Sequence, residues 1–302
     1  MRFTVITPTY NRAHRIQAAI ESVLAQTCDD FEYLIVDDGS TDETAAVVAR
    51  YRDPRIRLVR HHANAGQSAA CNTGMREARG DIIAFLDSDD TWFPDYLARM
   101  SEALDRNADA GFAYGRVVGR MSSTLSSSST YADVLTQGFL SCPTTLCVRT
   151  TLLCAVDGFS TAYAICNDDD LCFRLARRSS FVHVPDALAV AMPDAGSMTV
   201  NAPAFARGWD QLFTEYATEI VQHCGHLVLA SHRFMVADLY ASNGEVGEAI
   251  GQARQGMVSL LRRPRGIQPF KRRDLVGIPT RLVRKLTVAV RRRLLGGRRG
   301  TA

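Results

Sequence analysis

The segment ARGDIIAFLDSDDTW (78–92) decides the fold of this chain. Its centre, IIAFL (82–86), is a short run in which every side chain is apolar, as in a strand buried on both faces of a parallel sheet. The run ends in Asp87-Ser88-Asp89-Asp90, which places three carboxylates directly after a buried strand. The segment therefore predicts a central strand whose end carries polar side chains.

The residues before this segment predict strands and helices in alternation. Three more short apolar runs, RFTVIT (2–7), YLIVD (33–37) and IRLVR (56–60), predict strands. Apolar residues at helical spacing predict helices over 16–24 and 67–79. The resulting βαβαβαβ order is typical of an α/β fold with an open, mostly parallel sheet.

Other local signals place the remaining elements. Ser40-Thr41-Asp42-Glu43 fits a capping box, which predicts the start of a helix. Residues 122–130 are almost all Ser and Thr, and this composition predicts a loop. Later in the chain we expect a strand over 144–149, a helix over 168–178, a strand over 181–184, and helices between 203 and 261 with turns at Cys224-Gly225 and Ser242-Asn243-Gly244.

The composition is that of a soluble globular protein. The chain has 302 residues, of which 46% are hydrophobic and 22% charged, and its mean hydropathy is -0.07. These values exclude a wholly disordered, collagen-like or disulfide-scaffold protein. Eight cysteines without a CxxC pair predict reduced thiols in a cytoplasmic protein. Polar residues follow too soon for a signal peptide, and no stretch approaches the roughly 20 apolar residues of a membrane span.

Charge is distributed unevenly along the chain. Residues 262–302 contain 14 Lys and Arg and one acidic residue, so this tail carries +13 while the rest of the chain carries −10. Apolar residues recur at helical spacing within 280–295 and are flanked by bases, as in a helix that lies at a membrane surface. Nucleic acid is the rival partner, but the tail has one aromatic residue, Phe270, and therefore no stacking platform. A plain solvated helix is the third alternative.

Three polar clusters follow predicted strands, and the ends of parallel strands meet at one edge of a sheet. They are residues 7–12, 37–40 and 87–90. Any one of them could be an N-cap or a turn, but several carboxylates on one edge repel each other unless a cation joins them. The spacing Asp87-x-Asp89 can hold a hard divalent ion. Neither GxxxxGK[ST] nor GxGxxG is present, so the acids, a metal and side-chain donors would have to hold a nucleotide here.

Taken together, these motifs resemble glycosyltransferase family 2. The matching residues are TPTYNR (7–12), VDDGSTD (36–42), Asn64-x-Gly66, Asn72, ARGDIIAFLDSDDTW (78–92) and Pro94. The resemblance covers roughly residues 1–200. It implies a GT-A fold and inverting, metal-dependent transfer of a hexose from a nucleotide-diphospho-sugar, first of all a UDP-sugar. We therefore expect a GT-A domain over 1–202, with a nucleotide-sugar half over 1–118 and an acceptor half over 119–202, then a helical extension (203–261) and the tail (262–302).

The resemblance also implies roles for particular residues. The expected nucleotide-sugar-binding residues are Pro8, Tyr10, Arg12, Asp38, Asn64 and Asp87. Asp87 and Asp89 would hold Mg²⁺ or Mn²⁺ against the diphosphate. Asp168 falls where the family has its catalytic base, and Asp169 is the competing base. The helix N-terminus at 168–170 could also carry acids only because they stabilise the helix dipole.

The chain departs from the family pattern in three places. Asn167 replaces the usual Glu before the base, and Met192 and Asp194 stand where relatives carry an Arg-x-His. Two alternatives are open besides the transferase. One is a nucleotidyltransferase, which also pairs acidic metal ligands with a nucleotide on an α/β sheet. The other is a non-catalytic module that binds a sugar nucleotide or a partner, which these departures make possible. For the transferase we expect a glycan or lipid-linked acceptor, an anionic membrane surface as partner of the tail, no nucleic acid, and a peripheral location on the cytoplasmic face.

Overall fold

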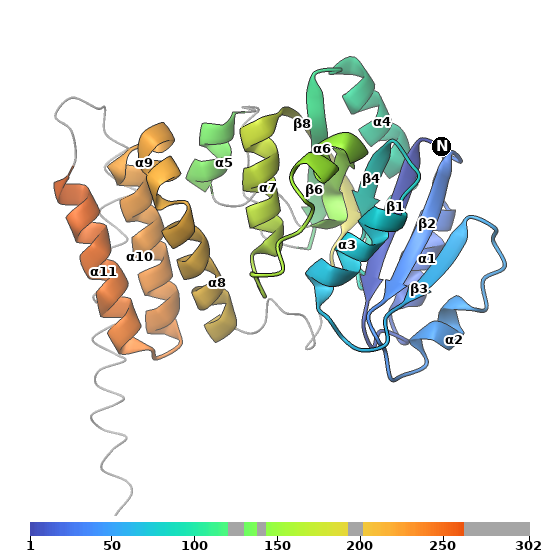
Figure 1. Ribbon diagram of the computed structural model, residues 1–302, viewed down its shortest axis with the longest axis horizontal. Coiled ribbons are helices and arrows are strands. Elements are labelled where there is room, and N and C mark those ends of the chain that lie inside the picture. Colours follow the sequence, from blue (N-terminus) through green and yellow to red (C-terminus); the bar gives the residue numbers. More distant parts are fainter. Residues whose placement is uncertain (120–129, 138–142, 193–201, 263–302) are drawn as a thin grey trace, which may run out of the picture. The chain divides into compact units, whose positions relative to one another are not determined.

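The computed structural model describes residues 1–119, 130–137, 143–192 and 202–262 (Figure 1). The chain forms two compact units, Met1–Gly196 and Ser197–Ala302, and each is described here by itself. Residues of the Ser/Thr-rich loop, Asp194 and the basic tail beyond 262 lie outside the described residues. The finer division of the first unit into nucleotide-sugar and acceptor halves stays a prediction.

A single sheet forms the centre of the first unit. Among the described residues it has eight strands in the order β3-β2-β1-β4-β7-β6-β8-β5. The strands are β1 Phe3–Thr9, β2 Phe31–Asp37, β3 Ile56–Arg60, β4 Ile82–Phe85, β5 Thr91–Trp92, β6 Ala110–Val118, β7 Leu146–Arg149 and β8 Ser180–Val190. Pairs β1–β2, β2–β3, β1–β4 and β6–β8 are parallel, while β4–β7, β6–β7 and β5–β8 are antiparallel. The predicted α/β fold with a mostly parallel sheet is confirmed.

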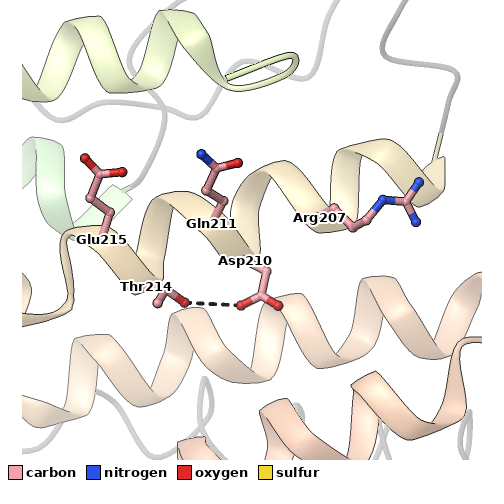
Figure 2. Close-up of a pocket in the computed structure, with 5 residues that line it drawn as sticks. All are labelled: Arg207, Asp210, Gln211, Thr214 and Glu215. Atoms are coloured by element: carbon pink, nitrogen blue, oxygen red, sulfur yellow. Dashed lines mark hydrogen bonds between the residues drawn. The ribbon is translucent and has the colours of Figure 1, made fainter. Parts of the chain in front are cut away.

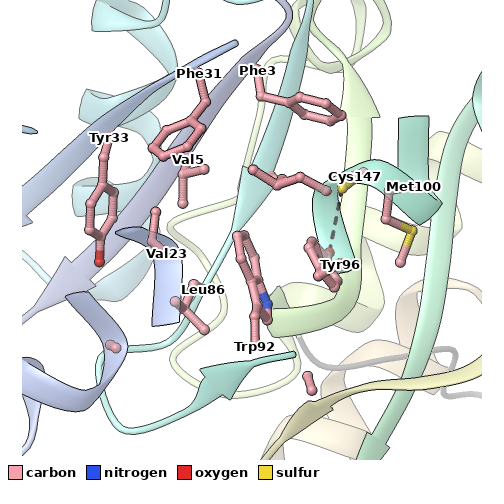
Figure 3. Packing of buried hydrophobic residues seen from close by; sticks show 14 of the residues in the cluster. Phe3, Val5, Val23, Phe31, Tyr33, Leu86, Trp92, Tyr96, Met100 and Cys147 are labelled. Carbon is pink, nitrogen blue, oxygen red and sulfur yellow. Dashed lines mark hydrogen bonds between the residues drawn. The ribbon is translucent and has the colours of Figure 1, made fainter. Parts of the chain in front are cut away.

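Helices cover the sheet and bury its two faces. They are α1 Ile16–Leu24, α2 Thr44–Val48, α3 Gln67–Glu77, α4 Tyr96–Arg106, α5 Tyr131–Gln137, the 3₁₀ turn η1 Pro143–Thr145, α6 Thr150–Ala155 and α7 Asn167–Arg178. Phe3 and Val5 of β1 join a core with Ile16 of α1 and Met100 of α4, part of which Figure 3 shows. The next residue of β1, Ile6, points the other way and lies against α3. The alternation along β1 thus places α3 on the face opposite to α1 and α4.

The capping box that the sequence predicts at Ser40–Glu43 is wrong. Helix α2 begins at Thr44, and its N-cap residue makes no side-chain capping bond. The hydroxyl of Ser40 instead accepts a hydrogen bond from the backbone N–H of Asn11, at 2.9 Å. The side chain of Ser40 therefore links the loop after β1 to the loop after β2, and it does not cap the helix.

Within residues 202–262, the second unit consists of helices, as predicted. They are α8 Ala202–Glu215, α9 Ala217–Cys224, α10 His226–Ser242 and α11 Val246–Leu261. Gly225 and Gly244 have φ of 86° and 81°, which ends a helix at each predicted turn. None of the described helices combines the length and apolar character needed to cross a bilayer.

A buried polar cluster holds α8, α10 and α11 together. The guanidinium of Arg233 donates to Asp210 and Gln252, each at 3.1 Å, and Tyr240 donates to Asp210 at 3.1 Å. A hollow of about 460 Å³ runs along α8, lined by Arg207, Asp210, Gln211, Thr214 and Glu215 (Figure 2). Because Asp210 is already engaged in the cluster below it, we assign the hollow no role.

Candidate active site

The first two predicted polar clusters meet at the carboxyl ends of β1 and β2. The backbone N–H of Asp38 donates to the carbonyl of Thr9 at 2.8 Å. Asn11 adopts a left-handed conformation with φ of 52°, which Asn tolerates better than most residues. Its side-chain oxygen accepts the N–H groups of Thr41 and Asp42 at 2.9 and 3.3 Å. The two loops are therefore locked together.

Asp38 is a buried carboxylate at this edge. Its side chain is only 4% exposed. Oδ1 accepts from the backbone N–H of Ala65 at 2.9 Å and contacts Nδ1 of His61 at 2.7 Å, while Oδ2 accepts the N–H of Gly66 at 2.8 Å. Asp38 thus accepts several hydrogen bonds at the place where the resemblance expects a nucleotide base.

The loop before α3 closes tightly on the turn after β2. Gly39 has φ of 77°, and a Cβ at this position would lie 2.7 Å from the carbonyl carbon of Ala63. Only glycine fits, because both the backbone conformation and the close approach exclude a side chain. Asn64, expected to bind the nucleotide-sugar, is exposed beside this contact.

The remaining predicted nucleotide-binding residues come from the end of β1. Pro8 is buried within the strand opposite Val36. Tyr10 is 42% exposed, an unusual position for an aromatic side chain. Arg12 is half-buried, and its backbone N–H donates to the hydroxyl of Thr44 at 2.9 Å. Tyr10 and Arg12 therefore stand at the accessible rim, whereas Pro8 shapes it from below.

Three carboxylates cluster after β4. One oxygen each of Asp87, Asp89 and Asp90 lies within 4.8 Å of the others. Such a set of hard oxygen donors fits a divalent cation, which would also relieve their mutual repulsion. Asp87 accepts a hydrogen bond from Nε2 of Gln67 on α3, at 2.9 Å. The residues present therefore fit the metal that the sequence predicts.

Asp90 belongs to this cluster although the sequence predicted only Asp87 and Asp89 as ligands. It is buried, and it accepts the hydroxyl of Thr144 at 2.6 Å and the backbone N–H of Met192 at 3.2 Å. These bonds tie the cluster to η1 and to the end of β8. Asp90 thus has a structural task, which leaves Asp87 and Asp89 as the more available ligands.

Asp168 lies in the first turn of α7 and is partly exposed. Asn167 before it donates from Nδ2 to the hydroxyl of Ser68 on α3 at 2.9 Å, and its Oδ1 accepts the N–H of Asp168 at 3.0 Å. Asn167 therefore links α7 directly to α3.

The two acids that follow Asp168 have other surroundings. Asp170 is buried and accepts two hydrogen bonds from Arg174, at 2.9 and 2.7 Å. Asp169 is also buried, and its Oδ1 has no hydrogen-bond partner among the described residues. Burial, together with the charges of Asp168 and Asp170, raises the pKa of Asp169 well above its usual value. The raised pKa favours the protonated form of this buried carboxyl, which weighs against Asp169 as the base.

The predicted acids converge around α3. Cys71, buried in this helix, has its pKa raised well above the usual value, chiefly by burial and then by the charges of Asp87, Asp168 and Asp38. The pKa of this thiol is therefore raised by one carboxylate each from the turn after β2, the turn after β4 and the start of α7. Sequence reasoning named all three acids, but the contribution of α3 to holding them was missed.

Asn72 of α3 adds a second link toward α7. Its side chain donates to the carbonyl of Phe159 and accepts the N–H of the same residue, both at 2.8 Å. Gly158, with φ of 64°, turns the chain at this point, and a Cβ there would lie 2.5 Å from Oδ1 of Asn72. Gly158 and Phe159 therefore form the point where α3 is hydrogen-bonded to the segment before α7.

Comparison with known proteins agrees with this geometry. The family model "Glycosyl transferase family 2" matches residues 4–155. The chain is 40% identical over 112 residues to UDP-Glc:alpha-D-GlcNAc-diphosphoundecaprenol beta-1,3-glucosyltransferase WfgD of Escherichia coli, a match covering 37% of this chain and 44% of WfgD. It is 49% identical over 102 residues to the succinoglycan biosynthesis protein ExoO of Rhizobium meliloti, covering 34% of this chain and 29% of ExoO. The matched segments thus span less than half of these relatives.

Solved structures share this fold. Staphylococcus aureus TarS 1-349 in complex with UDP-GlcNAc gives a TM-score of 0.66 at 19% identity, covering 98% of this chain and 92% of that one. The mannosyltransferase PcManGT of Pyrobaculum calidifontis, in complex with GDP-Man and Mn²⁺, gives 0.62 at 22% identity, covering 97% and 87%. These likenesses confirm the predicted GT-A fold. The chain belongs to glycosyltransferase family 2.

Proposed function

We propose that this chain is an inverting, divalent-cation-dependent glycosyltransferase that moves a hexose from a nucleotide-diphospho-sugar to a hydroxyl acceptor in polysaccharide or glycoconjugate synthesis. The observation that carries the proposal is that α3 and the residue before it hold all three parts of the site. Gln67 contacts Asp87, Ser68 contacts Asn167 beside Asp168, and the N–H of Gly66 contacts Asp38. Asp38, Asp87 and Asp168 are an acceptor for a base, a metal ligand and a proton acceptor, and the reaction needs all of them. Membership of the family supports the same assignment.

A UDP-sugar is the first candidate donor. An ionised carboxylate accepts hydrogen bonds and cannot donate them, so Asp38 suits the ring N–H of uracil. Tyr10, exposed at the same rim, offers a flat face on which a base could stack. The names of WfgD and of the TarS complex contain UDP-sugars, which adds support from related proteins.

Asp87 and Asp89 would hold Mg²⁺ or Mn²⁺. When bound, such a cation supplies Lewis-acid stabilisation of the negative charge on the departing diphosphate. The diphosphate leaves without taking a proton from the protein, so the chain needs to provide only one proton acceptor. The donor set is consistent with either ion.

Asp168 is the proposed proton acceptor. Its carboxylate would take the proton of the acceptor hydroxyl while the oxygen attacks the anomeric carbon. Attack from the face opposite the diphosphate inverts the configuration at that carbon. The bonds of Asn167 to Ser68 and to the N–H of Asp168 would fix where this carboxylate stands.

The acceptor is proposed to be a glycan or a lipid-linked sugar at the cytoplasmic face of a membrane. The basic tail, which carries +13, supports this because anionic lipids attract clustered bases. The name of WfgD contains a diphosphoundecaprenol-linked sugar, so at least one relative acts on such a molecule.

Calorimetry with UDP-, GDP- and dTDP-sugars, each with and without Mn²⁺, tests the proposal. We expect one class to bind, and to bind more tightly with the ion, while Asp87→Asn removes the effect of the ion. Binding that ignores the ion, or no binding to any of the three classes, would contradict the proposal. Release of pyrophosphate from a nucleoside triphosphate would instead favour the nucleotidyltransferase. Tight binding without turnover in the presence of acceptors would favour a non-catalytic module.

A further inference from the structure

His61 stands between Asp38 and α3, and neither the sequence motifs nor the proposed chemistry uses it. It directly follows β3, where its backbone N–H donates to the carbonyl of Asp37 at 2.9 Å. Its ring is half-buried and contacts two side chains. Nδ1 lies 2.7 Å from Oδ1 of Asp38, and Nε2 lies 3.0 Å from Oγ1 of Thr73 on α3.

The chemistry of the partners fixes the direction of each hydrogen bond. Both oxygens of Asp38 already accept backbone N–H groups, so Nδ1 of His61 is assigned as the donor in the bond to Oδ1. In the neutral ring with this tautomer, Nε2 is an acceptor, and the hydroxyl of Thr73 donates to it. The oxygen of Thr73 in turn accepts a hydrogen bond from Arg76 at 2.8 Å. With this assignment, each of Arg76, Thr73 and His61 donates to the next group toward Asp38.

We propose that His61, supported by Thr73 and Arg76, is the positioning residue for Asp38 and thereby sets the affinity for the donor nucleotide. The inference rests on the proposed function, in which Asp38 receives the base. Oδ1 of Asp38 is occupied by His61 and Ala65, whereas Oδ2 accepts only the N–H of Gly66 among the described hydrogen bonds. A free acceptor position therefore remains on Oδ2, and the N–H of the base is directed to that oxygen.

Two substitutions separate this role from simple packing. In His61→Asn the amide nitrogen takes the place of Nδ1, so the bond to Asp38 is kept. In His61→Gln the amide nitrogen lies farther out, near Nε2, and that bond is lost. Removing a hydrogen bond to a charged group typically costs about tenfold or more in binding. We expect His61→Gln to weaken UDP binding about tenfold and His61→Asn to stay within about threefold of the unchanged chain.

The experiment uses the full chain with Mn²⁺, UDP calorimetry, and donor KM and kcat for turnover. The KM for the donor should rise in His61→Gln while kcat stays constant, since the base is remote from the reacting carbon. His62→Gln is the matched control, because His62 is the neighbouring, exposed histidine. Equal UDP affinity in His61→Gln and the unchanged chain would overturn the inference. So would an Asn variant as weak as the Gln variant, because packing alone would then explain both.

A measurement on the unchanged chain covers the case in which a variant does not fold. Nitrogen chemical shifts of the His61 ring report which nitrogen carries the proton. The inference requires a protonated Nδ1 and an unprotonated Nε2, and the opposite tautomer would overturn it. If the unchanged chain binds no nucleoside diphosphate, the proposed function fails together with the binding role of His61. If it binds UDP but His61→Gln changes nothing, the positioning role alone fails.

Discussion

Asp168 and Asp169 are adjacent and chemically identical, yet the fold gives them opposite environments. Asp168 is partly exposed at the start of α7, whereas Asp169 is buried beside it. We expect Asp168→Asn to lower turnover by about 10² to 10⁴, the usual contribution of a general base. Affinity for UDP should stay nearly constant, because this carboxylate acts on the acceptor. Single-turnover rates and UDP calorimetry measure the two effects, and unchanged turnover would move the base elsewhere.

Asp169→Asn is the matched control for Asp168→Asn. Because burial and its charged neighbours raise the pKa of Asp169 well above its usual value, the folded chain favours its neutral, protonated form. Asparagine resembles that neutral form in shape, so turnover should stay within about threefold of the unchanged chain. A collapse in turnover equal to that of Asp168→Asn would identify Asp169 as the base.

The same pKa shift makes stability depend on pH with a definite sign. In the unfolded chain a carboxyl group ionises near its usual pKa of about 3.9, whereas Asp169 in the folded chain stays protonated to higher pH. The unfolded state therefore binds fewer protons above pH 4, and stability falls as pH rises toward the folded pKa. Asp169→Asn removes this loss. Urea unfolding at pH 4 and pH 7 should show the variant gaining stability over the unchanged chain at the higher pH only.

For single residues, the sequence predicts the acidic side chains of the site better than the residues that hold them in place. Asp38, Asp87 and Asp168 were predicted because each lies within a motif or at the end of a predicted strand or helix. His61 and Ser68 were not, since an isolated histidine or serine carries no pattern. Their roles arise only when the end of β3 and the start of α7 come close to α3. The roles of His61 and Ser68 depend on tertiary contacts, and no local sequence pattern predicts them.

Among the elements, α3 organises the site. It holds Asp87 through Gln67, Asn167 through Ser68, and Phe159 through Asn72. Asn72→Ala would leave both backbone groups of Phe159 without their partners, which costs about 1–3 kcal/mol when the groups are buried. We expect a loss of that size in urea unfolding. Gln17→Ala, which removes an exposed amide on α1, should cost less than about 0.5 kcal/mol. Equal losses of stability in the two variants would show that the hydrogen bonds between Asn72 and Phe159 contribute no more than an exposed side chain.

Strands built from short, mostly apolar runs could be predicted, whereas a strand whose pattern is interrupted by glycine could not. The runs at 2–7, 33–37 and 82–86 became β1, β2 and β4 because strands in the middle of a parallel sheet are buried on both faces. Strand β6 was missed, since Gly111 and Gly115 interrupt its pattern. Gly111 is needed there because a Cβ would lie 2.4 Å from Leu152 and Ser179. Close packing between distant segments thus requires glycine within β6, and glycine interrupts the apolar pattern by which a strand is predicted.

At the scale of the whole molecule, the net charge of +3 combines two parts of opposite charge, residues 1–261 with −10 and the tail 262–302 with +13. The basic tail lies outside the described residues, so its role rests on the sequence. Removing 262–302 leaves a chain with a net charge of −10, which anionic lipids should repel. We expect the full chain to sediment with phosphatidylglycerol vesicles but not with phosphatidylcholine vesicles, and the truncated chain with neither. Continued binding of the truncated chain to the anionic vesicles would contradict membrane attachment through the tail.

A pair of charge-matched variants shows whether the tail acts through its location or through total charge alone. Changing Arg281, Arg284 and Lys285 to Gln removes three bases beside the predicted apolar stripe. Changing Arg50, Arg52 and Arg79 to Gln removes three exposed bases from the first unit. Because each base near an anionic surface adds about 1 kcal/mol, the tail variant should bind vesicles about two orders of magnitude more weakly. The first-unit variant should bind like the unchanged chain. Equal weakening of both variants would show that the tail acts only through the total charge of the protein.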